Sequence, residues 1–168
     1  MVTCISHSPS ETQALGEAWG RDAMRGWVIA LTGHLGSGKT QLVKGLARGL
    51  GFSQLVLSPT FALVHTYAGG RLTLFHLDLY RLETPEQVVA AGLTDYLQPD
   101  GVTVIEWAER FVQRALDATG EPGEGRGGPT PLISLHSNMG RGSVPLRMVR
   151  IETLSERERR IVYEDIGS

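Results

Sequence analysis

One stretch of the chain matches the phosphate-binding pattern G-x-x-x-x-G-K-[ST]; it reads Gly33-His34-Leu35-Gly36-Ser37-Gly38-Lys39-Thr40. Its glycines let the backbone curl, so that successive N–H groups can face the oxygens of a phosphate. Lys39 adds a positive charge near the β- and γ-phosphates, and the Thr40 hydroxyl is suited to bind Mg²⁺. The stretch therefore predicts a site for a nucleoside triphosphate.

The residues on either side fit this interpretation. Trp27 to Leu31 is a short apolar run typical of a buried strand, and Gln41 to Arg48 has the apolar spacing of an amphipathic helix. The helix is expected to stop at Gly49. A strand, a glycine-rich turn and a helix in this order point the positive end of the helix at the phosphates. A merely flexible glycine loop would explain neither Lys39 nor Thr40.

Two acidic residues follow β-like runs further along the chain. Val102 to Ile105 leads directly into Glu106, the Walker B pattern, in which a carboxylate at the end of a central strand can reach Mg²⁺ or polarise a water. Asp78 comes near the end of a second run, Leu72 to Tyr80. The alternative for either acid is a solvated strand end.

Other signals outline the rest of the chain as a single domain over residues 1–168. Capping boxes at 10–13 and 84–87 predict two helix starts, and Gly69-Gly70 predicts a turn between strands over 61–67 and 72–80. A helix is expected over 108–118. Five Gly and three Pro between 117 and 131 predict a mobile loop. Further β-like runs cover 132–136, 146–154 and 161–163.

Composition sets limits on function. The 168 residues carry a formal net charge of −2, which argues against direct nucleic-acid binding through a basic surface. Cys4 is the single cysteine, so an intrachain disulfide is excluded and a reducing compartment is favoured. Because no apolar run approaches the roughly 20 residues of a membrane helix, we expect a cytoplasmic protein without a membrane partner.

Several classes of P-loop protein remain open from the residues alone. A GTPase would carry the guanine-reading motif N-K-x-D, which the sequence lacks. A small-metabolite kinase would use an arginine-bearing lid, for which Arg110, Arg114 and Arg126 are candidates. An ATP-hydrolysing switch needs a Mg²⁺ site and an acid that positions water. A binding module controlled by ATP occupancy alone would need neither Glu106 nor Asp78.

Four motifs in order resemble the bacterial TsaE (YjeE) family. They are residues 33–40, 58–61 (Ser-Pro-Thr-Phe), 76–81 (His-Leu-Asp-Leu-Tyr-Arg) and 104–107 (Val-Ile-Glu-Trp). The segment 86–96 also matches, so the resemblance covers about residues 8 to 110. After residue 110 the chain departs from the family pattern. The resemblance implies a small ATPase needed to form N6-threonylcarbamoyladenosine in tRNAs that read codons beginning with A. It also implies TsaB and TsaD as partners, with tRNA contacted only through them.

The resemblance also implies roles for individual residues. ATP is expected to lie on residues 33–41, including Gln41, and Mg²⁺ on Thr40 and Glu106. Asp78 is the second acid, either orienting the attacking water or completing the metal shell. Thr60 occupies a position like a switch threonine that senses the γ-phosphate. The remaining expected nucleotide contacts are Trp107, which is as well explained as a buried aromatic, and Arg157, with Arg159 as the second choice.

The expected fold is a three-layer α/β P-loop fold with a mainly parallel central sheet. The strands before the P-loop and before Glu106 should be central, with an added antiparallel hairpin over 61–80 and the C-terminal strands together at one side. The expected reaction is in-line attack of water on the γ-phosphate, neutralised by Mg²⁺, Lys39 and the loop amides. Hydrolysis should be weak without the partner.

Overall fold

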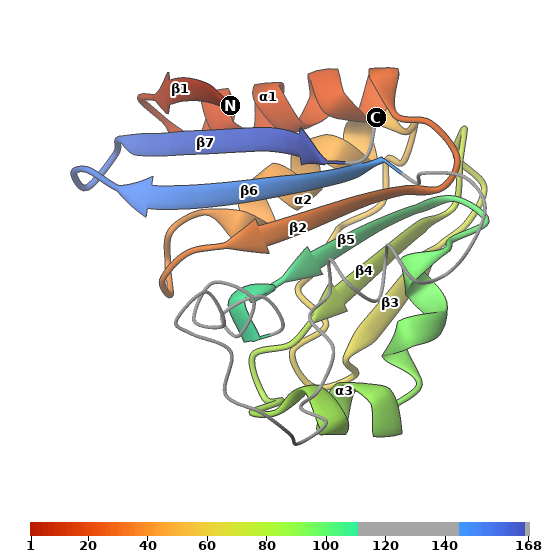
Figure 1. The fold of residues 1–168 in the computed structure, drawn as a ribbon. Coiled ribbons are helices and arrows are strands. Elements are labelled where there is room, and N and C mark those ends of the chain that lie inside the picture. The colour runs from red at the N-terminus through yellow and green to blue at the C-terminus, as the bar shows by residue number, and fades with distance from the viewer. Residues whose placement is uncertain (111–144, 167–168) are drawn as a thin grey trace.

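The computed structural model describes residues 1–110 and 145–166, which contain one seven-stranded sheet with helices on both faces (Figure 1). The elements in chain order are β1 (Val2–Ser6), α1 (Pro9–Asp22), β2 (Trp27–Thr32), α2 (Lys39–Gly49), β3 (Val64–Tyr67), β4 (Leu74–Asp78), α3 (Pro85–Ala90), the 3₁₀ helix η1 (Leu93–Leu97), β5 (Val102–Glu106), β6 (Leu146–Thr153) and β7 (Arg159–Ile166).

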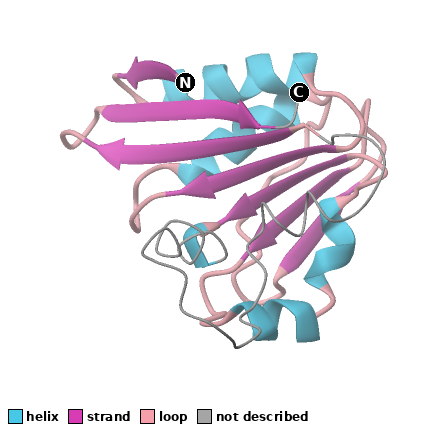
Figure 2. Ribbon diagram, viewed as in Figure 1, coloured by secondary structure: helices cyan, strands magenta, loops and turns pink. Residues whose placement is uncertain are grey.

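The sheet has a parallel centre with antiparallel strands at both edges. The strand order is β1-β7-β6-β2-β5-β4-β3, and Figure 2 shows the strands fanned into one twisted sheet. The parallel pairs are β4–β5, β5–β2 and β2–β6, while β3 and β7 run against their neighbours. The expected α/β fold, with central β2 and β5 and an added hairpin, is confirmed. One detail was wrong: the β3–β4 hairpin and the C-terminal strands lie on opposite sides of the β2–β5 pair.

Strand alternation divides the core between the two faces. Ile29, Leu31 and Val104 belong to the cluster that packs under α1 and α2. Val28, Ala30 and Ile105 point the other way, into the cluster that includes residues of α3 and η1. Because both faces are covered, the central strands read as continuous apolar runs instead of alternating ones. This is why the sequence signal for β2 and β5 was strong.

Helices α1 and α2 touch through their backbones. Each carries two glycines four residues apart on the shared face: Gly16, Gly20, Gly45 and Gly49. A Cβ added to Gly45 would lie 1.9 Å from the carbonyl oxygen of Gln13, and one added to Gly16 would lie 2.2 Å from that of Leu42. No side chain fits between the helices at these points. The contact fixes α1 against the helix that follows the P-loop.

Several boundaries differ from the sequence predictions. The capping box at 10–13 was wrong, because Ser8 is the N-cap: its backbone is extended and its hydroxyl accepts from Glu11 N. The second capping box, at Thr84, is confirmed. The predicted strand 61–67 begins only at Val64, after a turn closed by a hydrogen bond from Leu63 N to Pro59 O (2.7 Å). Strand β1 was missed because it is an edge strand, paired to β7 alone.

Some predictions fall outside the described residues: most of the helix over 108–118, the loop over 117–131, the strand over 132–136, and Arg114 and Arg126. None of the helices in the described part combines the length and the apolar character that crossing a membrane requires.

The α1–α2 contact predicts the effect of one added methyl group. Gly45→Ala should lower the free energy of unfolding by about 3 kcal/mol, because the methyl group would overlap a backbone oxygen and the helices would have to separate. Helix propensity alone predicts the opposite sign, a gain of about 1 kcal/mol. Urea unfolding followed by circular dichroism measures the change. Ala18→Ser, at an exposed position of α1, is the control and should change stability by less than about 0.5 kcal/mol.

Candidate functional site

The candidate site lies at the carboxyl ends of three neighbouring strands. Leu31 of β2 pairs with Glu106 of β5, and Glu106 pairs in turn with Asp78 of β4. The two acids therefore stand side by side at the edge of the sheet from which the P-loop leaves β2. A cavity of about 580 Å³ opens there, lined by the P-loop, both acids and residues from α1 and the β6–β7 turn. Ligands of open α/β sheets bind at this end of the strands.

The P-loop keeps its shape through backbone conformations that suit glycine. Gly38, the N-cap of α2, has φ 106° and nothing within 4 Å of an added Cβ, so its conformation alone requires glycine. Gly33 has φ 140°, and an added Cβ would lie 2.4 Å from Ile151 O of β6. The loop is therefore pressed against the neighbouring strand at its start. The N-terminus of α2 then opens into the cavity, as anion binding requires.

Lys39 is held inside the loop that contains it. Its Nζ donates to the carbonyls of Gly33 (2.6 Å) and His34 (3.0 Å) and lies 3.7 Å from the centre of the Trp107 ring. Burial lowers the pKa of Lys39, opposed by the nearby carboxylates of Glu106, Glu109 and Asp78. A phosphate entering the cavity would give this partly desolvated ammonium a charged partner.

Thr40 and Glu106 form the second part of the site. The Thr40 hydroxyl donates to the Glu106 carboxylate, 2.9 Å from Oε1 and 3.0 Å from Oε2. A hydroxyl and a carboxylate are hard oxygen donors of the kind Mg²⁺ prefers. No group of three or more His, Cys, Asp or Glu suited to a metal occurs among the described residues. This donor set fits Mg²⁺ held by few protein ligands together with phosphate oxygens.

Asp78 anchors the segment before β3. Its Oδ2 accepts from the hydroxyls of Thr60 (2.8 Å) and Ser58, and its Oδ1 accepts from Tyr80 N (2.9 Å). Asp78 is 2% exposed. The acid thus ties residues 58–60 to the end of β4 next to the P-loop. Sequence reasoning named Thr60 but not Ser58, although Ser58 belongs to the same Ser-Pro-Thr-Phe motif.

Trp107 follows Glu106 with a backbone that few large residues adopt. Its φ is 61°, in the left-handed region, where a bulky side chain is strained. The turn is held by a hydrogen bond from Ala108 N to Leu31 O (3.0 Å), and the Trp107 ring packs on Tyr80 with centroids 4.9 Å apart. The strained turn places the indole over Lys39 and in the wall of the cavity.

The two candidate arginines differ in their contacts. Arg159 Nε donates to Ser37 O (2.9 Å) and its Nη2 donates to Gly36 O (3.3 Å). These two hydrogen bonds join the start of β7 to the backbone of the P-loop. Arg157, the sequence's first choice, lines the cavity and is exposed. The structure therefore places both arginines at the site. Sequence spacing alone did not distinguish the two arginines. In the structure, Arg159 contacts the P-loop carbonyls, whereas Arg157 is exposed at the cavity.

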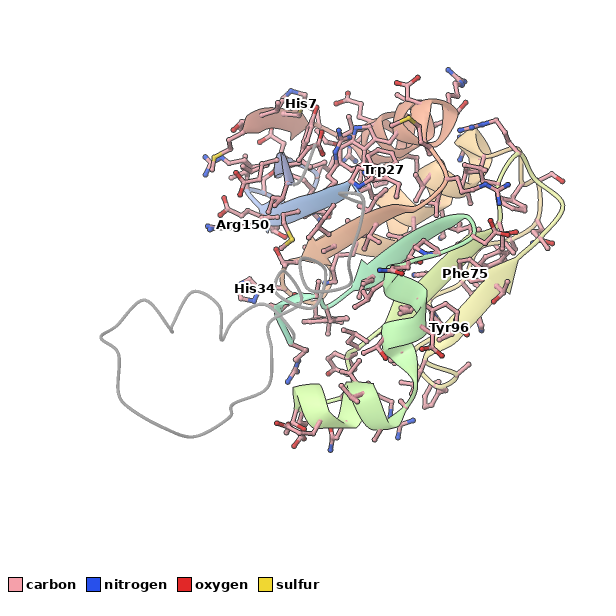
Figure 3. The ribbon with its side chains drawn as sticks, turned by 45° about the vertical axis from the view of Figure 1, so that its right-hand side comes forward. His7, Trp27, His34, Phe75, Tyr96 and Arg150 are labelled. Atoms are coloured by element: carbon pink, nitrogen blue, oxygen red, sulfur yellow. The ribbon has the colours of Figure 1, made fainter. Side chains whose placement is uncertain are left out.

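The remaining predicted residues lie at the rim. His34 and Leu35 are exposed, and Figure 3 shows His34 at the end of β2, at the edge of the described fold. Gln41 lines the cavity and accepts from Gln13 of α1 (2.7 Å). Arg110 is exposed and is not part of the cavity lining. The lining also includes Pro9 and Thr12 at the start of α1, which is held by the contact with α2 and, at Thr12, by a hydrogen bond with Ser6 of β1 (2.8 Å).

Comparison with known proteins identifies the family. The family model described as "Threonylcarbamoyl adenosine biosynthesis protein TsaE" matches residues 6–122 of this chain. The chain belongs to the TsaE family. A TsaE of Treponema pallidum is 46% identical over 118 residues, covering 70% of this chain and 87% of the relative. A TsaE of Bacillus subtilis is 42% identical over 101 residues, covering 60% and 63%.

A solved structure agrees with this TsaE assignment. The crystal structure of YdiB from Bacillus subtilis matches 99% of this chain and 86% of its own, with a TM-score of 0.66 and 26% identity. The TsaE family model ends at residue 122, so β6 and β7 lie beyond it. Arg159 of this TsaE therefore comes from a part of the chain that the family match does not reach.

The contrast between the two arginines gives a prediction. Arg159→Ala should weaken binding of Mg²⁺-ATP by about tenfold and lower the melting temperature, because the P-loop loses two hydrogen bonds to its carbonyls. Arg157→Ala should leave the melting temperature unchanged and weaken binding only to the extent that Arg157 contacts the nucleotide itself. Isothermal titration calorimetry and thermal melting separate these effects. If Arg159→Ala kept both stability and affinity, Arg159 would not be holding the P-loop in its binding conformation.

Proposed function

We propose that this chain is a Mg²⁺-dependent ATPase that acts with a TsaB–TsaD pair to form N6-threonylcarbamoyladenosine in tRNAs reading codons that begin with A. Membership of a family named for this biosynthesis supports the pathway. The observation that supports ATPase activity is the cavity itself. The Lys39 ammonium, the Thr40–Glu106 hydrogen bond and buried Asp78 all line it, at the carboxyl ends of the strands.

Each side chain has a chemical role in this proposal. The amides of residues 36–40 and the Lys39 ammonium bind the β- and γ-phosphates and neutralise charge that develops during hydrolysis. Thr40 and Glu106 hold Mg²⁺, which neutralises charge on the phosphates when bound. Asp78, already an acceptor for two hydroxyls, either orients the attacking water or completes the metal shell. Thr60, which donates to Asp78 (2.8 Å), senses the γ-phosphate.

The main polar groups of the site already have hydrogen-bond partners within the chain. Lys39 uses loop carbonyls as acceptors, and Thr40 donates to the carboxylate that would receive Mg²⁺. Binding of Mg²⁺-ATP must exchange these internal bonds for bonds to the ligand, which offsets part of the binding free energy. A partner that favours the exchanged arrangement would increase nucleotide affinity or turnover.

Removing the P-loop lysine tests the nucleotide site. Lys39→Ala should lower the affinity for Mg²⁺-ATP by about 10- to 100-fold, because a charge-assisted contact to phosphate is lost, while the protein stays folded. Lys44 of the same helix, outside the cavity lining, provides the control: Lys44→Ala should bind normally. Calorimetry measures the affinity and circular dichroism the fold. Normal ATP binding and hydrolysis by Lys39→Ala would falsify the site assignment.

The proposed reaction is tested by phosphate release from Mg²⁺-ATP with and without a purified TsaB–TsaD pair. We expect slow release by the chain alone, faster release with the pair, and an ATP-dependent complex on size-exclusion chromatography. Asp78→Asn should bind the pair but lose the stimulated release, since Asn cannot accept a proton from water or neutralise charge.

Two results would redirect the proposal. If Asp78→Asn and Glu106→Gln supported full tRNA modification without hydrolysis, ATP occupancy alone would control assembly. If the pair neither bound nor stimulated the chain, and phosphate appeared only after a pool of small metabolites was added, the chain would be a kinase. Chromatography and the phosphate assay distinguish these cases.

A further inference from the structure

His76 is a buried imidazole to which the proposed reaction assigns no role. It lies on β4 two residues before Asp78, so both side chains point to the same face of the sheet. The residue is fully buried, at 0% exposure, and its Nε2 lies 2.8 Å from Glu106 Oε1. A polar ring buried this deeply in a sheet needs a partner, and the carboxylate of the Walker B acid is that partner.

The chemistry of the pair fixes the direction of the hydrogen bond. An ionised carboxylate only accepts, so Nε2 must carry the proton that lies between the two groups. The other ring nitrogen, Nδ1, has no hydrogen-bond partner among the described residues. The Nε2 donor is thus committed to Glu106.

The two oxygens of Glu106 have different partners. Oε1 accepts from both His76 and Thr40, whereas Oε2 accepts from Thr40 alone. The Glu106 side chain is 4% exposed, so a rotation of the carboxylate would break a buried hydrogen bond to His76. The ring therefore holds the carboxylate in one orientation, in which Oε1 is shared by His76 and Thr40 and Oε2 contacts only Thr40, the second residue of α2.

We propose that His76 is a positioning residue that holds Glu106 through Oε1 and leaves Oε2 available to Mg²⁺, and so sets the affinity of the site for Mg²⁺. This inference rests on the proposed function, because it requires Glu106 to be a metal ligand. Groups that orient metal ligands in this way typically change metal affinity 10- to 100-fold when removed.

The test titrates Mg²⁺ against a fixed concentration of a fluorescent ATP analogue and measures the midpoint. His76→Leu should raise the Mg²⁺ midpoint by about 10- to 100-fold, while analogue binding in EDTA stays at the wild-type level. His76→Gln, which keeps a donor on a similar reach, should recover part of the shift. His65 is the matched control, since it pairs with His76 across β3–β4 but contacts Leu57 O; His65→Leu should leave the midpoint unchanged.

The outcomes separate this inference from the proposed function. A purely structural role for His76 predicts a lower melting temperature with an unchanged Mg²⁺ midpoint in His76→Leu, and this result would overturn the inference. If Glu106→Gln also kept the wild-type midpoint, the metal site itself would be wrong. Should His76→Leu fail to fold, ¹⁵N spectra of the wild-type imidazoles, assigned with His76→Gln, give the answer. A proton on Nε2 supports the inference, and a bare Nε2 excludes it.

Discussion

The site depends on the parallel pairing of β2, β5 and β4. This register sets Leu31, Glu106 and Asp78 level with one another at the carboxyl ends of the strands. The P-loop leaves from one of these ends and the two acids occupy the others, so the register alone brings a phosphate cradle and two carboxylates together. A slip of one residue would turn each side chain to the opposite face. A one-residue slip of β5 would exchange the side chains packed on the two faces and turn Glu106 away from the face that carries Asp78.

A second constraint holds the helices over this edge. Because α1 and α2 meet through glycines, the start of α1 comes close enough to line the cavity, and α2 is fixed with its N-terminus at the P-loop. On the other side, β7 sends Arg159 to the loop carbonyls. Elements from three separate parts of the chain thus surround one short loop. The loop itself has few contacts of its own to hold it, since Gly36 to Gly38 carry almost no side chain.

Each of the two acids at the site is held by its own set of hydrogen bonds. Glu106 accepts from His76 and Thr40, while Asp78 accepts from the segment that carries Thr60. Lys39 supplies a nearby positive charge. The buried carboxylates of Glu106 and Asp78 are therefore both hydrogen-bonded, as burial of charge requires. The bonds to Asp78 also fix residues 58–60 at the end of β4, beside the P-loop.

The sequence by itself determined the P-loop, Glu106 at the end of its strand, and the α/β arrangement. These features depend on local patterns: a glycine-rich turn between an apolar run and an amphipathic helix, and β-formers that end in an acid. Asp78 stood out in the same way, as an acid near the end of a β-like run, and the family motifs added its role as the second acid and the role of Thr60. The tertiary structure alone decided that Ser58 contacts Asp78 and that His76 contacts Glu106. It also decided that the C-terminal strands and the hairpin lie on opposite sides of the central strands, and that Arg159 bonds to the P-loop. These contacts join residues distant in sequence, and strand order and register, which set them, leave no local pattern in the chain.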